Sequence, residues 1–165
     1  MNKLFFIFFI ILTGGYSETG LEIVKMANKY IGKPYVYGGN SLTKGIDCSA
    51  FVKTIIKEKS GIALPRTAKN QAINTKRCSD VHLLSSLRLG DAIYFKNKKG
   101  KIHHVALVTG FDAKDGYPFI THAKGEEWGV VREKMSDNYR QEFYIGKRFT
   151  SCKNKIFKTL LIKNL

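Results

Sequence analysis

The sequence is short of acidic residues, and this shortage limits the partners that we expect. Asp and Glu number 13 against 28 Lys and Arg, which gives a formal net charge of +15 at pH 7. Exposed charge of one sign attracts polyanions and speeds encounter with them. Because the chain also begins like an exported protein, we expect the polyanion to be an anionic wall polymer or a membrane surface, and we expect no nucleic acid.

Long hydrophobic runs are also missing, since a membrane-spanning helix needs about 20 apolar residues. The longest apolar run, Leu4 to Leu12, follows Lys3 and leads into the small residues of 13–17. A basic start, a short apolar stretch and small residues are typical of a secretory signal peptide. No cysteine follows the run to accept a lipid. We therefore expect residues 1–17 to be a signal peptide, with export to the periplasm, the cell wall or the extracellular space.

Cysteine is scarce, and its number is odd. Two of the three cysteines can close a disulfide in an oxidising compartment, which leaves the third as a candidate reactive thiol. Cys48 is the candidate for the free thiol, while Cys78 and Cys152 either pair or remain apart. The spacing of cysteines and histidines matches no common zinc site, so we expect neither a metal nor a cofactor.

The chain contains no repeats, no low-complexity segments and no linker that would divide two domains. We expect one domain over 18–150 and a basic tail over 151–165. Hydrophobic periodicity predicts helices over 19–31, between Asp47 and Gly61, and over 67–71. Short runs rich in Val, Ile, Phe and Tyr predict strands over 92–96, 104–109, 119–122, 129–133 and 144–149. Helices followed by consecutive strands predict an α+β fold, with N-terminal helices packed on a central antiparallel sheet.

The basic tail has two interpretations. Its lysines alternate with apolar residues, and it contains no Asp or Glu. One interpretation is a short amphipathic helix that lies on a membrane or wall surface. The other is a docked or frayed terminal helix whose lysine face is solvated.

Cys48 stands where the chain leaves a glycine-rich loop and enters a predicted helix. Asp47 is a good N-cap for that helix. The free N–H groups at a helix start carry partial positive charge, which favours the reactive thiolate over a thiol of ordinary pKa, about 8.5. The alternative is a small buried residue at the start of a core helix.

Histidines supply the base that a thiol nucleophile needs, and a residue that orients the base. His103 and His104 occupy opposite faces of one predicted strand, because strand side chains alternate, and His122 ends the next strand. A hairpin around the turn at 112–117 would bring His104 and His122 together. The sequence therefore predicts Cys48, His104 and His122 as nucleophile, base and orienting residue. The alternative for each histidine is a satisfied core or surface residue.

Six segments carry a resemblance to a known family: 30–39, 45–52, 64–71, 87–95, 104–110 and 121–123. The second contains Asp-Cys-Ser-Ala at 47–50, where Ala50 replaces the usual Gly. In this order the segments resemble the motifs of the NlpC/P60 cysteine peptidases of bacterial cell walls, over about 21–149. The resemblance implies a papain-like α+β fold and a Cys-His-His triad. Cys48 would attack the amide carbonyl, His104 would act as base and then acid, and His122 would orient His104.

The resemblance also implies roles around the nucleophile. The Tyr35 hydroxyl would stabilise the oxyanion together with the backbone N–H of Cys48. Asp47 and Ser49 would shape the turn or the substrate site. Arg66 would bind a substrate carboxylate with two hydrogen bonds, and the alternative for it is an ordinary surface arginine.

The substrate that the family usually cuts is the stem peptide of peptidoglycan. The resemblance therefore implies an endopeptidase that forms a thioacyl-enzyme at D-glutamyl–diamino acid bonds or at cross-link bonds. The signal peptide adds export, and we expect a monomer, although the sequence itself leaves the oligomeric state open. It leaves open which bond is cut, and whether the wall belongs to the producer or to a competitor. Two alternatives stay open: a related thiol amidase or acyltransferase with a non-wall substrate, and a non-catalytic wall-binding protein.

Overall fold

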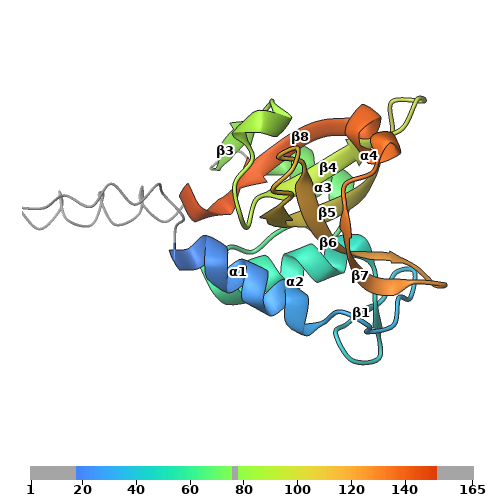
Figure 1. Ribbon diagram of the computed structural model, residues 1–165. Coiled ribbons are helices and arrows are strands. Elements are labelled where there is room, and N and C mark those ends of the chain that lie inside the picture. Colours follow the sequence, from blue (N-terminus) through green and yellow to red (C-terminus); the bar gives the residue numbers. More distant parts are fainter. Residues whose placement is uncertain (1–17, 76–77, 152–165) are drawn as a thin grey trace, which may run out of the picture.

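Two helices lie against one face of a curved antiparallel sheet in the computed structural model, which describes residues 18–75 and 78–151 (Figure 1). The helices are α1 (Glu18–Lys29) and α2 (Cys48–Ser60), and α3 (Ala68–Asn74) follows them. Between α1 and α2 the chain forms the small hairpin β1 (Asn40–Ser41) and β2 (Gly45–Ile46). Helices therefore precede the main sheet in the chain, as the sequence predicts.

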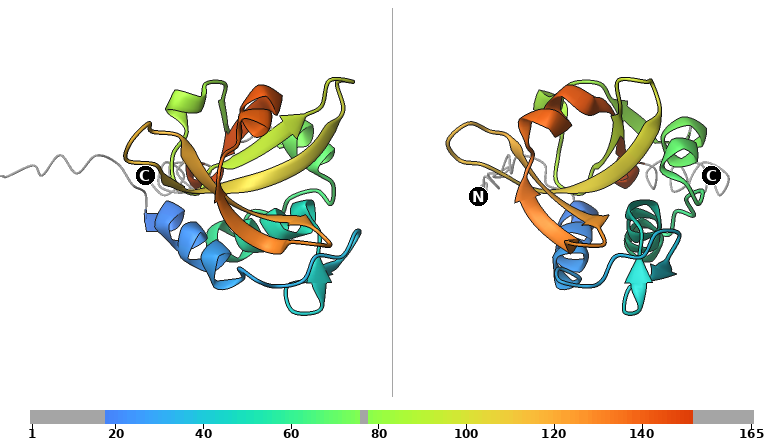
Figure 2. Two further views of the ribbon diagram at one scale, coloured as in Figure 1. Left: turned by 45° about the vertical axis from the view of Figure 1, so that its right-hand side comes forward. Right: turned by 90° about the vertical axis from the view of Figure 1, so that its right-hand side faces the viewer.

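The main sheet has six strands in the order β3-β8-β4-β5-β6-β7, and every neighbouring pair is antiparallel. Its strands are β3 (Ser79–Val81), β4 (Ala92–Lys96), β5 (Ile102–Phe111), β6 (Pro118–Gly125), β7 (Gly129–Lys134) and β8 (Phe143–Arg148). Figure 2 shows that the long central strands curl around the side of the sheet that faces away from α1 and α2. The α+β fold and the five predicted strands are confirmed.

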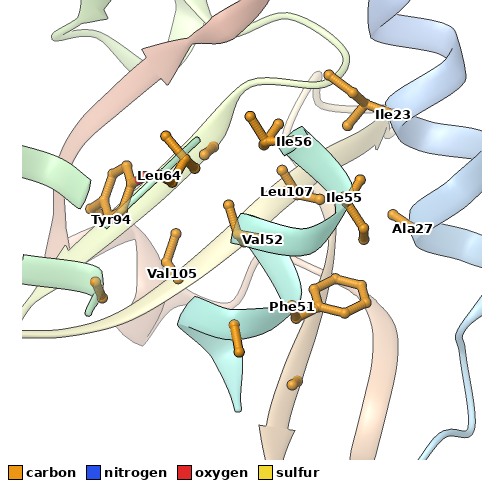
Figure 3. Close-up of a cluster of buried hydrophobic side chains, with 14 of the residues drawn as sticks. Ile23, Ala27, Phe51, Val52, Ile55, Ile56, Leu64, Tyr94, Val105 and Leu107 are labelled. Carbon is orange, nitrogen blue, oxygen red and sulfur yellow. The ribbon is translucent and has the colours of Figure 1, made fainter. Parts of the chain in front are cut away.

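Helix α2 forms where the sequence predicts it, because both of its ends are capped. The Asp47 side chain accepts a hydrogen bond from the Ala50 N–H at 2.8 Å. Gly61 ends the helix in the left-handed conformation, with φ of 72°. Along the helix, Val52, Ile55 and Ile56 are fully buried against the sheet (Figure 3). Packing and capping together fix the position of Cys48, the first residue of the helix.

Alternation along β5 divides the interior into two buried clusters. Val105 and Leu107 point toward the helices and pack in the larger cluster with residues of α1 and α2 (Figure 3). Ala106 and Val108 belong to a second cluster on the other face of the sheet, together with Phe95. Strand β5 is buried on both faces because helices cover one face and the curled sheet covers the other.

Six short elements were not predicted from the sequence. They are β3, the hairpin β1–β2, the single-turn helices η1 (Leu84–Ser86) and η2 (Phe149–Ser151), and α4 (Asp137–Glu142). Each is too short for a period to show in the residue pattern, and only α4 carries a cap signal, in which Ser136 accepts a hydrogen bond from the Tyr139 N–H. Helix α4 lies beside the sheet end that holds the two predicted histidines, so its omission matters for the site.

Several predictions fall outside the described residues. These are the signal peptide at 1–17, the tail beyond 151, and Cys152. Cys48 is a free thiol and Cys78 is disulfide-bonded, while the pairing of Cys78 with Cys152 stays a prediction. Among the described residues, no helix combines the length and hydrophobicity that a membrane crossing requires.

Candidate active site

Cys48 lies at the N-terminal end of α2, and its thiol contacts the central strand β5. The sulfur accepts a hydrogen bond from the backbone N–H of Val105, the residue that follows His104 in β5. The backbone N–H groups of Ser49 and Cys48 itself also hydrogen-bond the thiol. The helix end therefore presents N–H donors to the sulfur, as expected from the sequence.

The protonation state of Cys48 nevertheless differs from the sequence expectation. Burial raises the pKa of the Cys48 thiol to about 11, and the backbone N–H donors lower it too little to compensate. The negative charge of Asp47 beside it acts in the same direction as burial. Because a thiolate is costly in this desolvated place, the resting residue is a neutral thiol, and an attack on substrate needs a base that removes its proton.

His104 and His122 form a direct hydrogen bond, with His104 Nε2 2.6 Å from His122 Nδ1. They come from the hairpin β5–β6, whose turn lies where the sequence predicts it. Both side chains are buried, and His122 has no exposed surface. The predicted proximity of the two histidines is confirmed.

Desolvation sets the charge of His104. Burial lowers the pKa of this imidazole well below its ordinary value, and the neighbouring His122, His103 and Lys124 lower it further. His104 is therefore neutral at pH 7 and able to accept a proton. A neutral thiol and a neutral imidazole are the reactants of general-base catalysis rather than a preformed ion pair.

Tyr139 of α4 closes the histidine pair from one side. Its ring is stacked on His104, with centroids 5.7 Å apart, and meets His122 edge-on at 5.6 Å. Phe95 stacks on His104 from β4 at 5.7 Å. These rings restrict the imidazole of His104 to one plane and keep water away from it, which is consistent with its lowered pKa.

Glu133 of β7 completes the chain of contacts. Its Oε1 atom lies 3.0 Å from His122 Nε2, and Lys124 Nζ donates to its Oε2 at 2.8 Å. The hydrogen bond with His122, followed by that with Lys124, lowers the pKa of Glu133 to about 2. The residue is therefore a carboxylate at every pH of interest, and it contacts the histidine pair at the end away from His104.

A second polar cluster surrounds the start of α2. Arg66 binds Asp47 through two parallel contacts, NH1–Oδ1 at 3.0 Å and NH2–Oδ2 at 2.7 Å. Ser49 donates to Asp47 Oδ1 at 2.9 Å and receives a hydrogen bond from Arg66 NH1 at 2.9 Å. Burial alone would raise the pKa of Asp47, but the hydrogen bonds from Arg66, Ala50 N–H and Ser49 together hold it below its ordinary value. The three residues that the sequence predicts for substrate binding thus lie together and bind one another.

Buried Gln71 of α3 supports this cluster from behind. Its Nε2 donates to the backbone carbonyls of Ser49 and Pro65, each at 2.9 Å. Tyr94 donates to its Oε1 at 3.4 Å. The loop that carries Arg66 is therefore fastened to the first turn of α2.

Tyr35, the predicted oxyanion residue, lies in the loop between α1 and β1. That loop is tied to β7: Gly32 N–H donates to Val130 O, and Val130 N–H donates to Lys33 O, both at 2.8 Å. The close approach requires glycine at 129, because a Cβ there would lie 2.5 Å from Lys33 O and the backbone has φ of +65°. Burial raises the pKa of Tyr35, and so does the negative charge that the nearby Cys48 would carry once ionised. The Tyr35 hydroxyl is therefore protonated and able to donate.

Two surface depressions reach the site. One, of about 860 Å³, is lined by the nucleophile candidate, Tyr35, Tyr37, Arg66 and His103. The other, of about 880 Å³, is lined by Tyr139, Glu133, Lys124 and Lys96. All the predicted residues except His104 and His122 line the first depression. The buried histidines instead contact residues that line the second.

Glu133 and Tyr139 were missed from the sequence. Glu133 had a usable signal: His122 is paired with Val131 in the β6–β7 ladder, and Glu133 is two positions further along the same strand face. Tyr139 had none, because α4 itself was not predicted. In the described ranges, no group of three or more His, Cys, Asp or Glu side chains is arranged to hold a metal ion.

Comparison with known proteins agrees with this geometry. The profile of the NlpC/P60 family matches residues 32–149. The chain belongs to the NlpC/P60 family. It is 38% identical over 130 residues to the gamma-DL-glutamyl hydrolase of Bacillus subtilis, with 78% of this chain and 29% of that protein covered. It is 32% identical over 119 residues to the murein DD-endopeptidase MepH of Escherichia coli, with 72% and 41% covered. The chain thus spans less than half the length of these NlpC/P60 relatives.

Solved structures of the family share the fold. An NlpC/P60 protein from Bacillus cereus superposes with a TM-score of 0.66 at 29% identity, over 79% of this chain and 40% of that one. The NlpC/P60 domain of the peptidoglycan hydrolase SagA superposes with a TM-score of 0.62 at 25% identity, over 78% of this chain and 97% of that domain. The papain-like NlpC/P60 fold expected from the sequence is confirmed.

Proposed function

We propose that this protein is an exported cysteine endopeptidase that hydrolyses an amide bond in peptidoglycan stem peptides. The observation that carries the proposal is the buried His104–His122 hydrogen bond beside the helix-terminal thiol of Cys48, in a chain of the NlpC/P60 family. Relatives named as hydrolases or endopeptidases of D-amino acid linkages add support. A D-glutamyl–diamino acid bond is the first candidate and a cross-link bond the second.

The proposed reaction starts from two neutral groups. As Cys48 attacks the scissile carbonyl, its proton passes to His104 and leaves an imidazolium there. His104 then returns that proton to the departing amine, and water hydrolyses the thioacyl-enzyme with His104 again as the base. His122 accepts a hydrogen bond from His104 Nε2–H throughout and stabilises the transient imidazolium.

The oxyanion of the tetrahedral intermediate needs donors near the sulfur. The backbone N–H of Cys48 and the hydroxyl of Tyr35 supply them in this proposal, because both lie in the same depression as the thiol. The fastening of the Tyr35 loop to β7 keeps that donor from moving away.

Substrate binding is assigned to Asp47, Ser49 and Arg66 around the nucleophile. Arg66 has its NH1 and NH2 groups engaged with Asp47, Ser49 and Gly39 O, and its Nε–H would be the donor for a substrate carboxylate. Basic residues elsewhere, including the tail at 151–165, would hold the enzyme on anionic wall polymer or a membrane surface.

Digestion of purified peptidoglycan tests the proposal. Residues 18–165 and the same chain with Cys48→Ala are incubated with sacculi of both diamino acid types, and the released peptides are identified by mass spectrometry. Products released by the parent alone support the peptidase and name the bond. If neither protein releases peptides, the peptidase proposal is wrong, and turnover of non-wall amides or lipid esters would instead favour an amidase or acyltransferase.

A further inference from the structure

In a hydrogen bond between two histidines, either ring can be the donor, and only one of these two directions suits the reaction. His104 Nε2 and His122 Nδ1 are 2.6 Å apart, so one carries the proton and the other accepts it. If His104 donates, its remaining nitrogen, Nδ1, is bare and can take the thiol proton. If His122 donates, the proton of neutral His104 lies on Nδ1, and the base is blocked.

The contact between His122 and Glu133 decides between these directions. A carboxylate only accepts hydrogen bonds, and Glu133 Oε1 lies 3.0 Å from His122 Nε2. His122 therefore carries its proton on Nε2, its Nδ1 is bare, and the hydrogen bond from His104 Nε2 must point toward His122. Each nitrogen in these two contacts then has a matching partner.

Lys124 keeps the carboxylate of Glu133 ionised, so that Glu133 remains a hydrogen-bond acceptor for His122. Its ammonium group donates to Glu133 Oε2 at 2.8 Å and also lies 4.9 Å from the centre of the Trp128 ring. The side chains of Lys124 and Glu133 are only 28% and 29% exposed, so the pair is held in one geometry at the rim of the second depression.

We propose that Glu133 is a positioning residue, which sets the tautomers of His122 and His104 so that His104 Nδ1 is free to deprotonate Cys48. The inference deepens the proposed peptidase, on which it rests for its kinetic readout. It makes β7 part of the catalytic apparatus, although no atom of Glu133 touches substrate or sulfur.

Lys124 gives the proposal a distinctive test. In Glu133→Gln, the ammonium of Lys124 attracts the amide oxygen, and the amide NH2 then faces His122 Nε2. That arrangement reverses the proton direction and places a proton on His104 Nδ1. In the double variant Lys124→Met/Glu133→Gln, the amide is free to turn its oxygen toward His122, while Met keeps the apolar stem beside Trp128.

Three measurements separate positioning from simple support of the fold. The first is kcat and KM on a muropeptide. The second is the rate of Cys48 alkylation by iodoacetamide at pH 7, which needs no substrate. The third is the ¹⁵N spectrum of the histidine rings, which distinguishes protonated from bare nitrogens at His104 and His122. Asp115→Asn, which removes an ion pair with Lys134 in the neighbouring turn, is the control for loss of an acid beside β7.

We expect Glu133→Gln to lower kcat and the alkylation rate about 10- to 100-fold, with little change in KM. Losses of this size are typical when a residue that orients a functional side chain through a hydrogen bond is removed. The double variant should recover about 10-fold in both rates, and Asp115→Asn should match the parent. The spectrum should show the His122 proton on Nε2 in the parent and on Nδ1 in Glu133→Gln.

A parent spectrum with the His122 proton on Nδ1 overturns the proposal, even if no variant folds. Parental rates in Glu133→Gln, or a loss that Lys124→Met does not relieve, overturn it as well. If the muropeptide is not cleaved by the parent, the proposed function fails alone, because alkylation and the spectrum still test the role of Glu133.

Discussion

The start of α2 and the part of β5 and β6 that carries His104 and His122 differ in the charge of their main groups. At the helix start, Asp47 and Arg66 are fully ionised and bound to each other, so their charges are fixed. At the sheet end, His104 is buried and neutral, and its partner His122 contacts the carboxylate of Glu133. Fixed, paired charges suit a structure that must hold its shape, whereas a buried neutral imidazole suits a proton that must move.

Removal of the nucleophile should have the largest effect. Cys48→Ala and Cys48→Ser should lower kcat by at least about 10⁴-fold, because the covalent step has no substitute. Neither change should alter the urea midpoint greatly, since Cys48 is half-buried at the rim and carries no fixed charge. Muropeptide cleavage and equilibrium unfolding measure the two. Residual cleavage within 100-fold of the parent would exclude Cys48 as the nucleophile.

The two histidines should differ in their effects. His104→Ala removes the base and should lower kcat about 10³- to 10⁴-fold, whereas His122→Ala leaves a base without orientation and should cost about 10²-fold. The double variant should be no worse than His104→Ala, because the residues act as one unit. Initial rates on one muropeptide check this order. A larger loss for His122→Ala than for His104→Ala would reverse the assigned roles.

The elements most easily predicted from the sequence are those with a period long enough to read. Helix α2 shows its apolar face over three turns between an Asp cap and a Gly cap, β5 is long and rich in β-branched residues, and β6 follows it across a turn. The histidine pair follows from a hairpin alone, because strand alternation assigns His104 and His103 to opposite faces. Burial of His104 and exposure of His103 agree with that assignment.

What could not be predicted depends on tertiary contact. The raised pKa of Cys48 results from burial against β5, and no residue pattern around position 48 reports it. The pairing of Arg66 with Asp47 joins residues 19 apart in sequence, which are separated by the whole of α2 and the irregular loop that follows it. Tyr139 lies on a six-residue helix that packs against the histidines only after the sheet has curled.

Loss of the fixed ion pair should affect stability more than a comparable loss elsewhere on the surface. Arg66→Met leaves Asp47 ionised in a mostly buried place, with 12% of its side chain exposed. Breaking a fully buried pair costs about 3–5 kcal/mol and an exposed pair about 0–1 kcal/mol. Because the Arg66 side chain is 39% exposed, we expect the free energy of unfolding to fall by about 1–2 kcal/mol. Urea denaturation measures it.

The matched control for this variant is Lys134→Met. Lys134 of β7 pairs with Asp112 and Asp115 of the β5–β6 turn, and all three side chains are partly exposed. Its replacement should leave the urea midpoint close to that of the parent, because solvent screens exposed charges. Equal losses in the two variants would mean that the charges at the start of α2 are not specially held, and the contrast between the two regions would fail.

The pH dependence is the mildest effect and separates a neutral resting pair from an ion pair. Since burial lowers the pKa of His104 below about 6.5, its ordinary value, the acid limb of kcat/KM should lie below pH 6.5, where His104 takes up a proton and can no longer act as base. A thiol with a pKa near 11 stays protonated at neutral pH. Alkylation of Cys48 by iodoacetamide should therefore continue to rise with pH through 8 and 9. A preformed thiolate–imidazolium pair would instead give a flat alkylation rate from about pH 5 to 8, because its thiolate is already present over that range. A flat profile would show that the N–H groups at the start of α2 lower the pKa of Cys48 more than burial raises it. The proton of Cys48 would then already lie on His104 at rest, and the contrast between the two regions would fail.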